Sequence, residues 1–264
     1  MKVLGKVAVI TGGARGFGKA FSEALLKRGA KVCFSDIDIS GGQRSERELA
    51  ERFGENSVHF VKCDVTKEEE FSDLLRECLS KFKKINIMVN NAGILDEARW
   101  EQCIAVNMTA MMRGTYLALD KMNPENGGEG GTIINVSSAA GIYPAFFLPA
   151  YVASKHGILG FTRSLAMDPH YQRQGIQFAS LCPAFSATNM LTEAIHGDAG
   201  GRQTILYPDM AKGIVEKLGI CSVEDITNAF MELVEKESCN GDVLMINKKI
   251  GKQYQFVENT TSRL

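Results

Sequence analysis

Tyr151 and Lys155 are spaced so that they could transfer a proton together. On a helix, residues four positions apart share one face, so the Lys155 ammonium can lie beside the Tyr151 phenol. A free phenol has a pKa of ~10 and is a weak base at neutral pH, but a nearby positive charge favours the phenolate. Tyr151 could then accept a hydroxyl proton while a hydride leaves the same carbon for a nicotinamide. The same spacing is common on helix surfaces. The surrounding sequence therefore decides whether the pair is catalytic or an ordinary surface pair.

Ser138 precedes Tyr151 by 13 residues and closely follows a predicted strand, residues 132–136. The carboxyl edge of a parallel sheet is where ligands of α/β proteins bind. A hydroxyl there can bind a substrate oxygen and orient it between the base and a hydride acceptor. Ser137 is the competing candidate and is interpreted as structural, although either serine alone is typical of a strand-end turn.

A glycine-rich loop, residues 11–18, lies between the first predicted strand and a helix. Glycines let the backbone turn tightly and approach a pyrophosphate, while the helix presents free N–H groups and the positive end of its dipole. A structural turn would also use glycines, but the strand–loop–helix order is the one that dinucleotide binding requires. The predicted cofactor contacts in this loop are Gly12, Arg15, Gly16, Phe17 and Gly18.

Asp36 ends the second predicted strand, 18 residues after Gly18. An acid at this strand end accepts hydrogen bonds from ribose hydroxyls and repels a 2′-phosphate, which predicts NAD rather than NADP. Arg15 argues the other way, because a basic residue in the loop can hold that phosphate. We give Asp36 more weight because it lies where the ribose is expected; a turn-capping role is its alternative. Ile37 is assigned to the same cofactor contact.

Two further strand ends are predicted to face the cofactor. Cys63, Asp64 and Val65 follow the third strand. Asp64 could accept a hydrogen bond from the adenine amino group while the Val65 backbone contacts the base; helix capping is the alternative for Asp64. Asn91 and Gly93 follow the fourth strand, where amide and small residues can line a cofactor. Taken alone, they also suit an ordinary turn.

The elements that must position these residues alternate along the chain. Short β-branched runs predict strands at 7–10, 31–35, 58–63, 85–89, 132–136, 177–181 and 242–246. Amphipathic stretches predict helices at 19–28, 42–52, 68–82 and 223–236. This alternation indicates an α/β fold: one Rossmann-type, doubly wound parallel sheet of about seven strands with helices on both faces. We expect a single domain over 1–264, with its core at 5–247 and a polar tail at 248–264.

Composition excludes several other functions. The 264 residues are 45% hydrophobic and 23% charged, enough for a sizeable core, and the net charge of −1 gives no overall attraction to nucleic acid. No run approaches the ~20 apolar residues of a membrane span, and no secretory signal is visible. The seven cysteines are scattered and lack metal-ligand spacing. We expect a cytoplasmic protein with reduced, mostly packing cysteines, no metal site and no stable membrane insertion.

A known family unites these signals. The chain resembles the short-chain dehydrogenase/reductase family over residues 5–247, through the glycine loop, residues 90–93, Ser138, Tyr151 and Lys155. The resemblance implies an NAD-dependent alcohol dehydrogenase with Ser138, Tyr151 and Lys155 at its catalytic centre. Tyr151 and Lys155 are also assigned as cofactor contacts. It also implies a fourth catalytic residue, Asn107, which would hold a water linking Lys155 to bulk solvent.

The resemblance further implies a nicotinamide loop after the sixth strand, residues 183–188, with contacts from Phe185, Ser186 and Thr188. The family's usual Pro-Gly is Pro183-Ala184 here, and alanine adopts a positive φ less readily than glycine. A homodimer is implied as well, with a tetramer as the alternative, packed through the helices around 107–120 and 152–167.

Within the family, the chain is similar to the branch that oxidises prostaglandins with NAD. The likeness is carried by residues 114–117, 126–131, 153–157 and 160–164. It implies oxidation of the 15-hydroxyl of prostaglandins, or of related hydroxy fatty acids, to a ketone, with substrate contacts from Ser138, Leu148, Tyr151 and Phe185. That branch has a glutamine where this chain has Leu148. Leucine cannot donate the missing hydrogen bond, which is worth about 0.5–1.5 kcal/mol.

A lipid substrate needs an apolar groove. The predicted wall residues, which could instead pack in the core or in a dimer interface, are Ile142, Tyr143, Phe146, Phe147, Leu148 and Phe185. Residues 188–208 could form a mobile flap over this pocket or an ordinary surface excursion. The alternative functions are a dehydrogenase for a steroid, a retinoid or another lipid alcohol, and a non-catalytic dinucleotide sensor. The sensor is less favoured because it would not need the full catalytic set.

Overall fold

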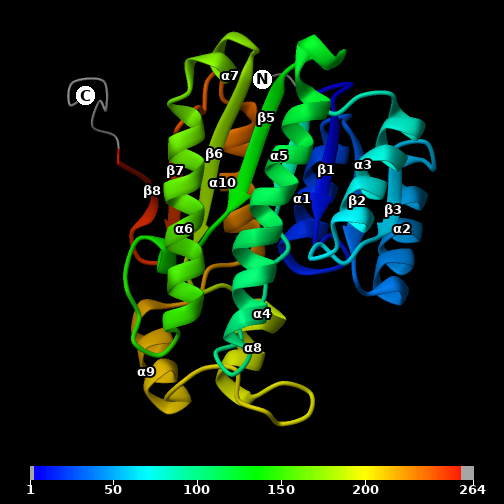
Figure 1. Cartoon of the computed structure of the whole chain (residues 1–264). Coiled ribbons are helices and arrows are strands. Elements are labelled where there is room, and N and C mark those ends of the chain that lie inside the picture. Colours follow the sequence, from blue (N-terminus) through cyan, green and yellow to red (C-terminus); the bar gives the residue numbers. More distant parts are fainter. Residues whose placement is uncertain (1–2, 257–264) are drawn as a thin grey trace.

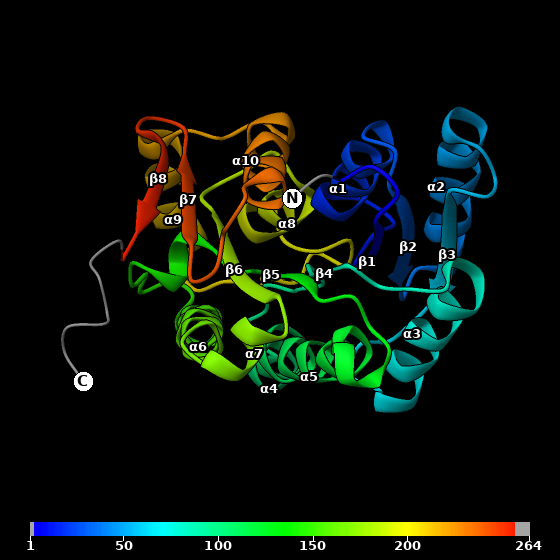
Figure 2. The same cartoon turned by 90° about the horizontal axis from the view of Figure 1, so that it is seen from above.

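The computed structural model describes residues 3–256 as one twisted sheet with helices on both sides (Figures 1 and 2). Among these residues, the strand order is β3-β2-β1-β4-β5-β6-β7-β8, and the pairs are parallel except for β7 with β8. The strands are β1 (Val7–Thr11), β2 (Lys31–Asp36), β3 (Val58–Lys62), β4 (Ile87–Asn90), β5 (Gly131–Val136), β6 (Ile176–Pro183), β7 (Val243–Asn247) and β8 (Gly251–Gln255). The Rossmann-type doubly wound fold predicted from the sequence is confirmed.

The sheet has eight strands among the described residues, one more than the predicted count of about seven. All seven predicted strands are present, but β8 adds an antiparallel edge strand in the tail that the sequence left without a structure. Its sequence, GKQYQ, is polar and largely exposed, so it lacks the apolar pattern that marks a buried strand. Contacts with a helix hold it: Tyr254 donates to Glu232 at 2.8 Å, and Lys252 pairs with the same carboxylate.

Helices cover both faces of the sheet (Figure 2). One face carries α1 (Gly16–Lys27), α2 (Ile39–Phe53) and α10 (Val223–Glu235), and the other carries α3 (Glu68–Phe82), α5 (Ala110–Met122), α6 (Pro149–Ala166) and α7 (Pro169–Arg173). The four helices predicted by range are confirmed as α1, α2, α3 and α10. In α3, the buried residues recur every three or four positions, so one apolar stripe faces the sheet. On the opposite face, Phe21 of α1 stacks on Phe230 of α10 with ring centroids 4.1 Å apart.

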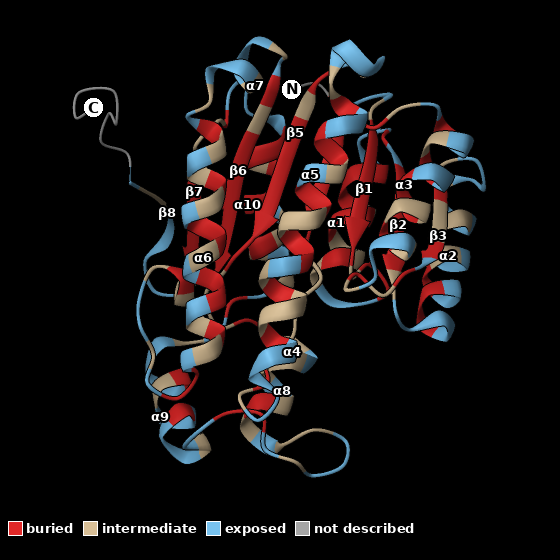
Figure 3. Cartoon of the chain, viewed as in Figure 1, coloured by how far each residue is buried: buried red, intermediate tan, exposed pale blue. Residues whose placement is uncertain are grey.

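The strands themselves form the centre of the core (Figure 3). Every residue of β1 and β4 is buried, as expected for parallel strands covered on both faces. Successive strands extend in opposite directions from β1 and β4, so a crevice opens at the carboxyl ends of these two strands. The glycine loop follows β1 at this edge, and Ser138 follows β5 there.

Irregular segments and short helices lie beyond the carboxyl edge of the sheet (Figure 1). They include α4 (Trp100–Ile104), the π-helical turn η1 (Ala105–Thr109), the 3-10 turn η3 (Ala139–Gly141), α8 (Asn189–His196) and α9 (Pro208–Leu218). A further 3-10 turn, η2 (Pro124–Asn126), precedes β5. Among residues 3–256, no helix has the length and apolar character to cross a membrane.

Candidate active site

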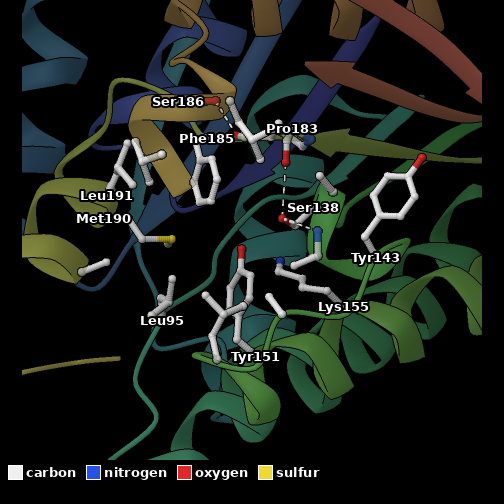
Figure 4. Close-up of a pocket in the computed structure, with 18 of the residues that line it drawn as sticks. Leu95, Ser138, Tyr143, Tyr151, Lys155, Pro183, Phe185, Ser186, Met190 and Leu191 are labelled. Atoms are coloured by element: carbon white, nitrogen blue, oxygen red, sulfur yellow. Dashed lines mark hydrogen bonds between the residues drawn. The ribbon is translucent and has the colours of Figure 1, made fainter. Parts of the chain in front are cut away.

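Tyr151 and Lys155 lie on the first two turns of α6 and are both buried. The Lys155 Nζ is 5.4 Å from the centroid of the Tyr151 ring and donates to the Val136 carbonyl at 2.9 Å. Figure 4 shows the two side chains converging with Ser138 on one space. The four-residue spacing therefore does place the phenol and the amine side by side, as predicted.

For the protein chain alone, the pKa of Tyr151 lies above that of a free phenol, whereas the lowering predicted from the sequence relies on positive charge beside the phenol. Burial raises the pKa of Tyr151 to about 12, and an interaction with the Ser138 hydroxyl acts in the opposite direction. Burial also lowers the pKa of Lys155 from 10.5 to about 8. Removal from water penalises the charged form of each group, phenolate and ammonium alike, and burial is the largest cause of both shifts. At neutral pH Tyr151 therefore carries its proton unless further positive charge comes near it.

Ser138 and Ser137 are held in different ways. The Ser138 Oγ accepts a hydrogen bond from Ala140 N at 3.1 Å and donates to the Pro183 carbonyl at 3.3 Å (Figure 4). The Ser137 Oγ donates to the Lys155 carbonyl at 2.9 Å and is buried, as its structural interpretation expects. Of the two serines, only Ser138 has a hydroxyl that is held at the strand end and also lies beside the Tyr151 phenol.

Asn107 is buried in η1, a π-helical turn between α4 and α5. Its amide oxygen accepts from Ile94 N at 2.8 Å, and its Nδ2 donates to Ile94 O at 2.9 Å and to Ser154 Oγ at 3.2 Å. These bonds engage the amide NH2 group and one of the two lone pairs of the amide oxygen. A Cβ on Gly93 would lie 3.2 Å from the Asn107 oxygen and 3.7 Å from Lys155 Nζ, which shows how tightly this corner is packed.

The glycine loop packs backbone against backbone. A Cβ on Gly12, whose φ is +66°, would lie 2.9 Å from Ala92 Cα, and one on Gly18 would lie 2.2 Å from the Gly12 carbonyl oxygen. Asn91 fixes this approach, because its Nδ2 donates to Thr11 O at 2.9 Å and to Gly12 O at 3.0 Å. The loop therefore leaves room for a ligand only on its outer side.

The start of α1 suits an anion. Its N-cap, Arg15, makes no side-chain capping hydrogen bond, and its first turn has no acidic residue. At Gly16, nothing lies within 4 Å of the position a Cβ would take, so the space in front of the helix is open. Free amides at an open helix N-terminus are the arrangement that binds phosphate. This fits the pyrophosphate of a dinucleotide.

Asp36 and Asp64 have local bonding roles as well as the predicted ones. Asp36 accepts from Ala14 N at 3.0 Å and from Asp38 N at 3.1 Å, which ties the strand end to the glycine loop. Asp64 accepts from Thr66 N at 3.0 Å and from Thr66 Oγ1 at 2.7 Å, which closes a turn before α3, whose N-cap is Lys67. A carboxylate accepts several hydrogen bonds, so neither arrangement prevents a cofactor contact. Exposed Ile37 and the buried pair Cys63 and Val65 lie at the same two strand ends.

A cavity of about 480 Å³ opens beside Tyr151. Of the predicted groove residues, Tyr143, Phe146, Phe147, Leu148 and Phe185 line it. Ile142 follows the alternative interpretation: it is partly buried and packs against a separate core cluster of Leu159, Cys182, Val243 and Met245. The cavity also reaches several predicted cofactor residues, namely Phe17, Asn91, Gly93, Phe185, Ser186 and Thr188. Nicotinamide and substrate contacts are thus brought together, while Asp36 and Asp64 lie at the ends of more distant strands.

Part of the cavity wall was missed by the sequence interpretation. These residues lie on α8, on α9 and in adjoining segments: Leu95, Met190, Leu191, Ala194, Ile195, Ile205, Ala211, Ile214, Val215 and Leu218. Their three- and four-residue spacing on the two helices was a usable signal. Residues 189–207 do lie over the pocket, so the flap interpretation describes their position better than the surface excursion. Figure 4 shows Leu95, Met190 and Leu191 on this side of the cavity.

The nicotinamide loop does not need the glycine that the family usually has there. Ala184 does not have a positive φ, and its N–H donates to the Ile246 carbonyl at 2.9 Å. The loop continues through Ser186, whose Oγ donates to Ala184 O at 2.8 Å, to Thr188. Alanine therefore accommodates this path without backbone strain.

Comparison with known protein families identifies the family of this chain. The family model described as short chain dehydrogenase matches residues 6–199. This chain therefore belongs to the short-chain dehydrogenase family, and the resemblance drawn from its sequence is confirmed.

Particular relatives narrow the class. The chain is 41% identical to 15-hydroxyprostaglandin dehydrogenase [NAD(+)] of Rattus norvegicus over 255 residues, which cover 97% of this chain and 96% of the relative. It is 40% identical to the enzyme of the same name from Homo sapiens, covering 98% and 97% of the two chains. A crystal structure of a short chain dehydrogenase/reductase from Burkholderia phymatum in complex with NAD is similar with a TM-score of 0.77 and 26% identity, covering 89% of this chain and 87% of that one.

Proposed function

We propose that this protein uses NAD to oxidise a secondary hydroxyl of a hydrophobic substrate to a ketone, and that its substrates are prostaglandins with a 15-hydroxyl or related hydroxy fatty acids. One observation carries the proposal: Ser138, Tyr151 and Lys155 all face one largely apolar cavity of about 480 Å³. This volume is within the range of sites that enclose small organic ligands.

The chain has a place for each part of the cofactor. The glycine loop and the open start of α1 would hold the pyrophosphate, Asp36 the ribose, and Phe185, Ser186 and Thr188 the nicotinamide end. NAD supplies a hydride acceptor when bound. The preference for NAD over NADP is supported by the Asp36 carboxylate, by the names of the two prostaglandin-oxidising relatives and by the NAD in the Burkholderia phymatum structure.

The catalytic residues divide the chemistry among them. Ser138 and Tyr151 bind the substrate hydroxyl oxygen, and the Tyr151 Oη takes its proton as the C–H electron pair leaves as hydride. Because burial raises the pKa of Tyr151 to about 12, the phenolate needs both Lys155 and the positive charge that an oxidised nicotinamide adds. Asn107 and Lys155 would return the proton to solvent through a water.

The prostaglandin assignment is supported by 40–41% identity to the two relatives over nearly the whole chain. Leu148 favours a second candidate. It lines the cavity, is 5% exposed and cannot hydrogen-bond a substrate hydroxyl as the glutamine of the prostaglandin branch does. A steroid, a retinoid or another lipid alcohol is therefore the second substrate class.

Initial rates of NADH formation test the proposal. Purified protein is given NAD+ with prostaglandin E2, a 15-hydroxy fatty acid, a 17β-hydroxysteroid or retinol, and each reaction is repeated with NADP+. Turnover of the first two with NAD+ supports the proposal. Turnover of only the steroid or retinol replaces the substrate class and leaves the cofactor and catalytic residues in place. Equal rates with NADP+ would contradict the role of Asp36.

The same proposal includes a homodimer, with a tetramer as the alternative, in the cytoplasm. The exposed Tyr116 of α5 forms an edge-to-face pair with Phe161 of α6, with centroids 5.5 Å apart, on the face expected to meet a second subunit. All seven cysteines are buried and unpaired, which suits a reducing compartment. Sedimentation velocity distinguishes a dimer from a tetramer.

A further inference from the structure

Asp96 and Glu97 are neighbouring acids after β4 that have no role in the function proposed above. One binds the segment that covers the cavity, and the other binds the catalytic helix. We propose that they set the active-site geometry together: Glu97 is a positioning residue for Tyr151, and Asp96, through Arg202, holds residues 189–207 against the substrate. The inference rests on the proposed function in one respect, that alcohols react in this cavity.

Glu97 provides the N-terminal cap of the catalytic helix. The N-cap residue of α6, Leu148, makes no side-chain capping bond, and Pro149 has no N–H to donate. The next two amides both bind Glu97: Ala150 N donates to Oε2 at 3.0 Å and Tyr151 N donates to Oε1 at 3.0 Å. A carboxylate at a helix N-terminus satisfies free amides and matches the positive end of the dipole. The backbone of Tyr151 is therefore fixed by a residue 54 positions earlier in the chain.

Asp96 binds the segment that covers the cavity. Its carboxylate is 2% exposed and accepts two parallel hydrogen bonds from Arg202, each 2.9 Å long. Arg99 donates to the same carboxylate at 2.7 Å, but it lies three residues away and outside the covering segment. The Arg202 side chain holds the pKa of Asp96 well below its usual range. A backbone hydrogen bond lies next to this ion pair: Glu97 N donates to the Thr204 carbonyl at 2.8 Å.

These bonds decide where one wall of the cavity lies. Met190, Leu191, Ala194, Ile195 and Ile205 of the covering segment all line it. Ala194 and Ile205 are buried in the same apolar cluster as Tyr151. If Arg202 releases Asp96, this wall loses its charged anchor while Tyr151 keeps its own through Glu97. The two acids should thus affect different kinetic quantities.

A chain-length series separates the two roles. Rates with NAD+ are measured for 2-butanol, 2-hexanol, 2-octanol and 2-decanol. The value of kcat is expressed per NADH-binding site, because misfolded protein binds no NADH and would otherwise lower the apparent kcat. Each methylene that the cavity buries should raise kcat/KM about fourfold in the wild type, as ~0.8 kcal/mol of transfer free energy implies. The slope of log kcat/KM against chain length then reports the fit of the wall.

Glu97→Gln tests the positioning role. Glutamine keeps one acceptor oxygen and turns an N–H group toward the second amide, so Tyr151 shifts. We expect kcat per site to fall about tenfold at every chain length, with an unchanged slope, since small misplacement of a reacting group lowers rates steeply. The matched control is Glu101→Gln, on the exposed surface of α4, which should leave kcat within about twofold. If Glu97→Gln keeps wild-type kcat per site, the positioning role is overturned.

Arg202→Met tests the wall, with Arg99→Met as the matched control. Both variants remove a guanidinium from the same carboxylate, but only Arg202 belongs to the covering segment. Arg202→Met should flatten the slope, so that kcat/KM for 2-decanol falls about tenfold while that for 2-butanol changes less than twofold. NADH binding, measured by fluorescence, should stay unchanged. Equal slopes in the two variants would overturn the role of Asp96 and Arg202.

Failure of the proposed function has a different signature. If the wild type oxidises the alcohol series but not prostaglandin E2, the lipid assignment falls and the inference is still decided by the variants. If the wild type oxidises no alcohol with NAD+, both the proposed function and the inference are overturned. If the wild type is active and neither variant differs from its control, the inference alone falls.

Discussion

The cofactor end and the substrate end of the active-site crevice are built from different kinds of contact. At the cofactor end, backbone meets backbone: positions such as Gly18 have no space even for a Cβ. At the substrate end, apolar side chains from α8, from α9 and from the loop before α6 form the wall, and Arg202 binds part of that wall to Asp96. The first arrangement depends on the path of the main chain, whereas the second depends on side chains that can be exchanged singly. A change of substrate therefore requires less rebuilding than a change of cofactor.

Tyr151 lies where the two ends meet, and its replacement should have the largest effect. Tyr151→Phe removes only the hydroxyl that accepts the proton, so turnover should fall about 10³-fold or more. NADH affinity, measured by fluorescence titration, should remain within about twofold, because the cofactor end is built by other residues. Tyr143→Phe is the control, since it removes a phenol oxygen from the same cavity without touching the catalytic group. Unchanged turnover in Tyr151→Phe would contradict the catalytic role of Tyr151.

Burial of the Lys155 amine beside Tyr151 lowers the free energy of unfolding when the amine is charged. Burial lowers the pKa of Lys155 from 10.5 to about 8, so between these two pH values the unfolded chain binds more protons than the folded one. The free energy of unfolding therefore rises with pH in this window, by up to about 3 kcal/mol at 1.36 kcal/mol for each pH unit. Below pH 8 the folded protein carries the full penalty.

Lys155→Met removes this penalty from the cofactor-free protein. It should stabilise the chain at pH 7, and the gain should shrink as the pH rises from about 8 toward 10. Urea unfolding at a series of pH values measures the difference, and Lys212→Met on the exposed surface of α9 controls for the loss of a lysine. A gain that stays constant with pH would show that Lys155 is not buried with its charge.

Gly18→Ala tests the backbone packing of the cofactor end directly. The new Cβ would lie 2.2 Å from the Gly12 carbonyl oxygen and 2.8 Å from Asn91 Nδ2, so α1 must move away from the loop. We expect NADH affinity to fall at least about tenfold, even though alanine favours helices by about 1 kcal/mol. Gly160→Ala, in α6, meets no atom within 4 Å and should bind NADH normally. Equal affinities in the two variants would remove the contrast between the ends.

The same contrast explains what could be predicted from the sequence. The seven parallel strands and the glycine loop follow from local patterns, because buried β-branched runs and glycine spacing are visible in a few consecutive residues. Tyr151 and Lys155 are also local neighbours on a helix. The polar strand β8 carries no such pattern, and only its contacts with α10 define it.

The substrate end was less predictable because its contacts connect distant parts of the chain. Asp96 and Arg202 are 106 residues apart, and nothing in either segment indicates the other. An apolar stripe on α8 or α9 shows that one face is covered without showing by what. For Ile142 the sequence left both cavity and core open, because consecutive apolar residues do not reveal which of them face the cavity. The Tyr151 pKa also depends on burial, to which distant residues such as Ala194 and Ile205 contribute, and a local helix pattern does not reveal that burial.

Leu148→Gln tests the substrate end and has the smallest expected effect of these variants. Leu148 lines the cavity three residues before Tyr151, and glutamine would restore the hydrogen bond that the prostaglandin branch makes to the reacting hydroxyl. That bond is worth about 0.5–1.5 kcal/mol, so KM for prostaglandin E2 should fall about two- to tenfold. NADH affinity should not change, because Leu148 has no part in the cofactor end. Leu148→Met is the control, since it keeps the side chain apolar at similar volume. If both variants raise KM equally, the site is shaped for an apolar group, and the steroid or retinoid class becomes the better assignment.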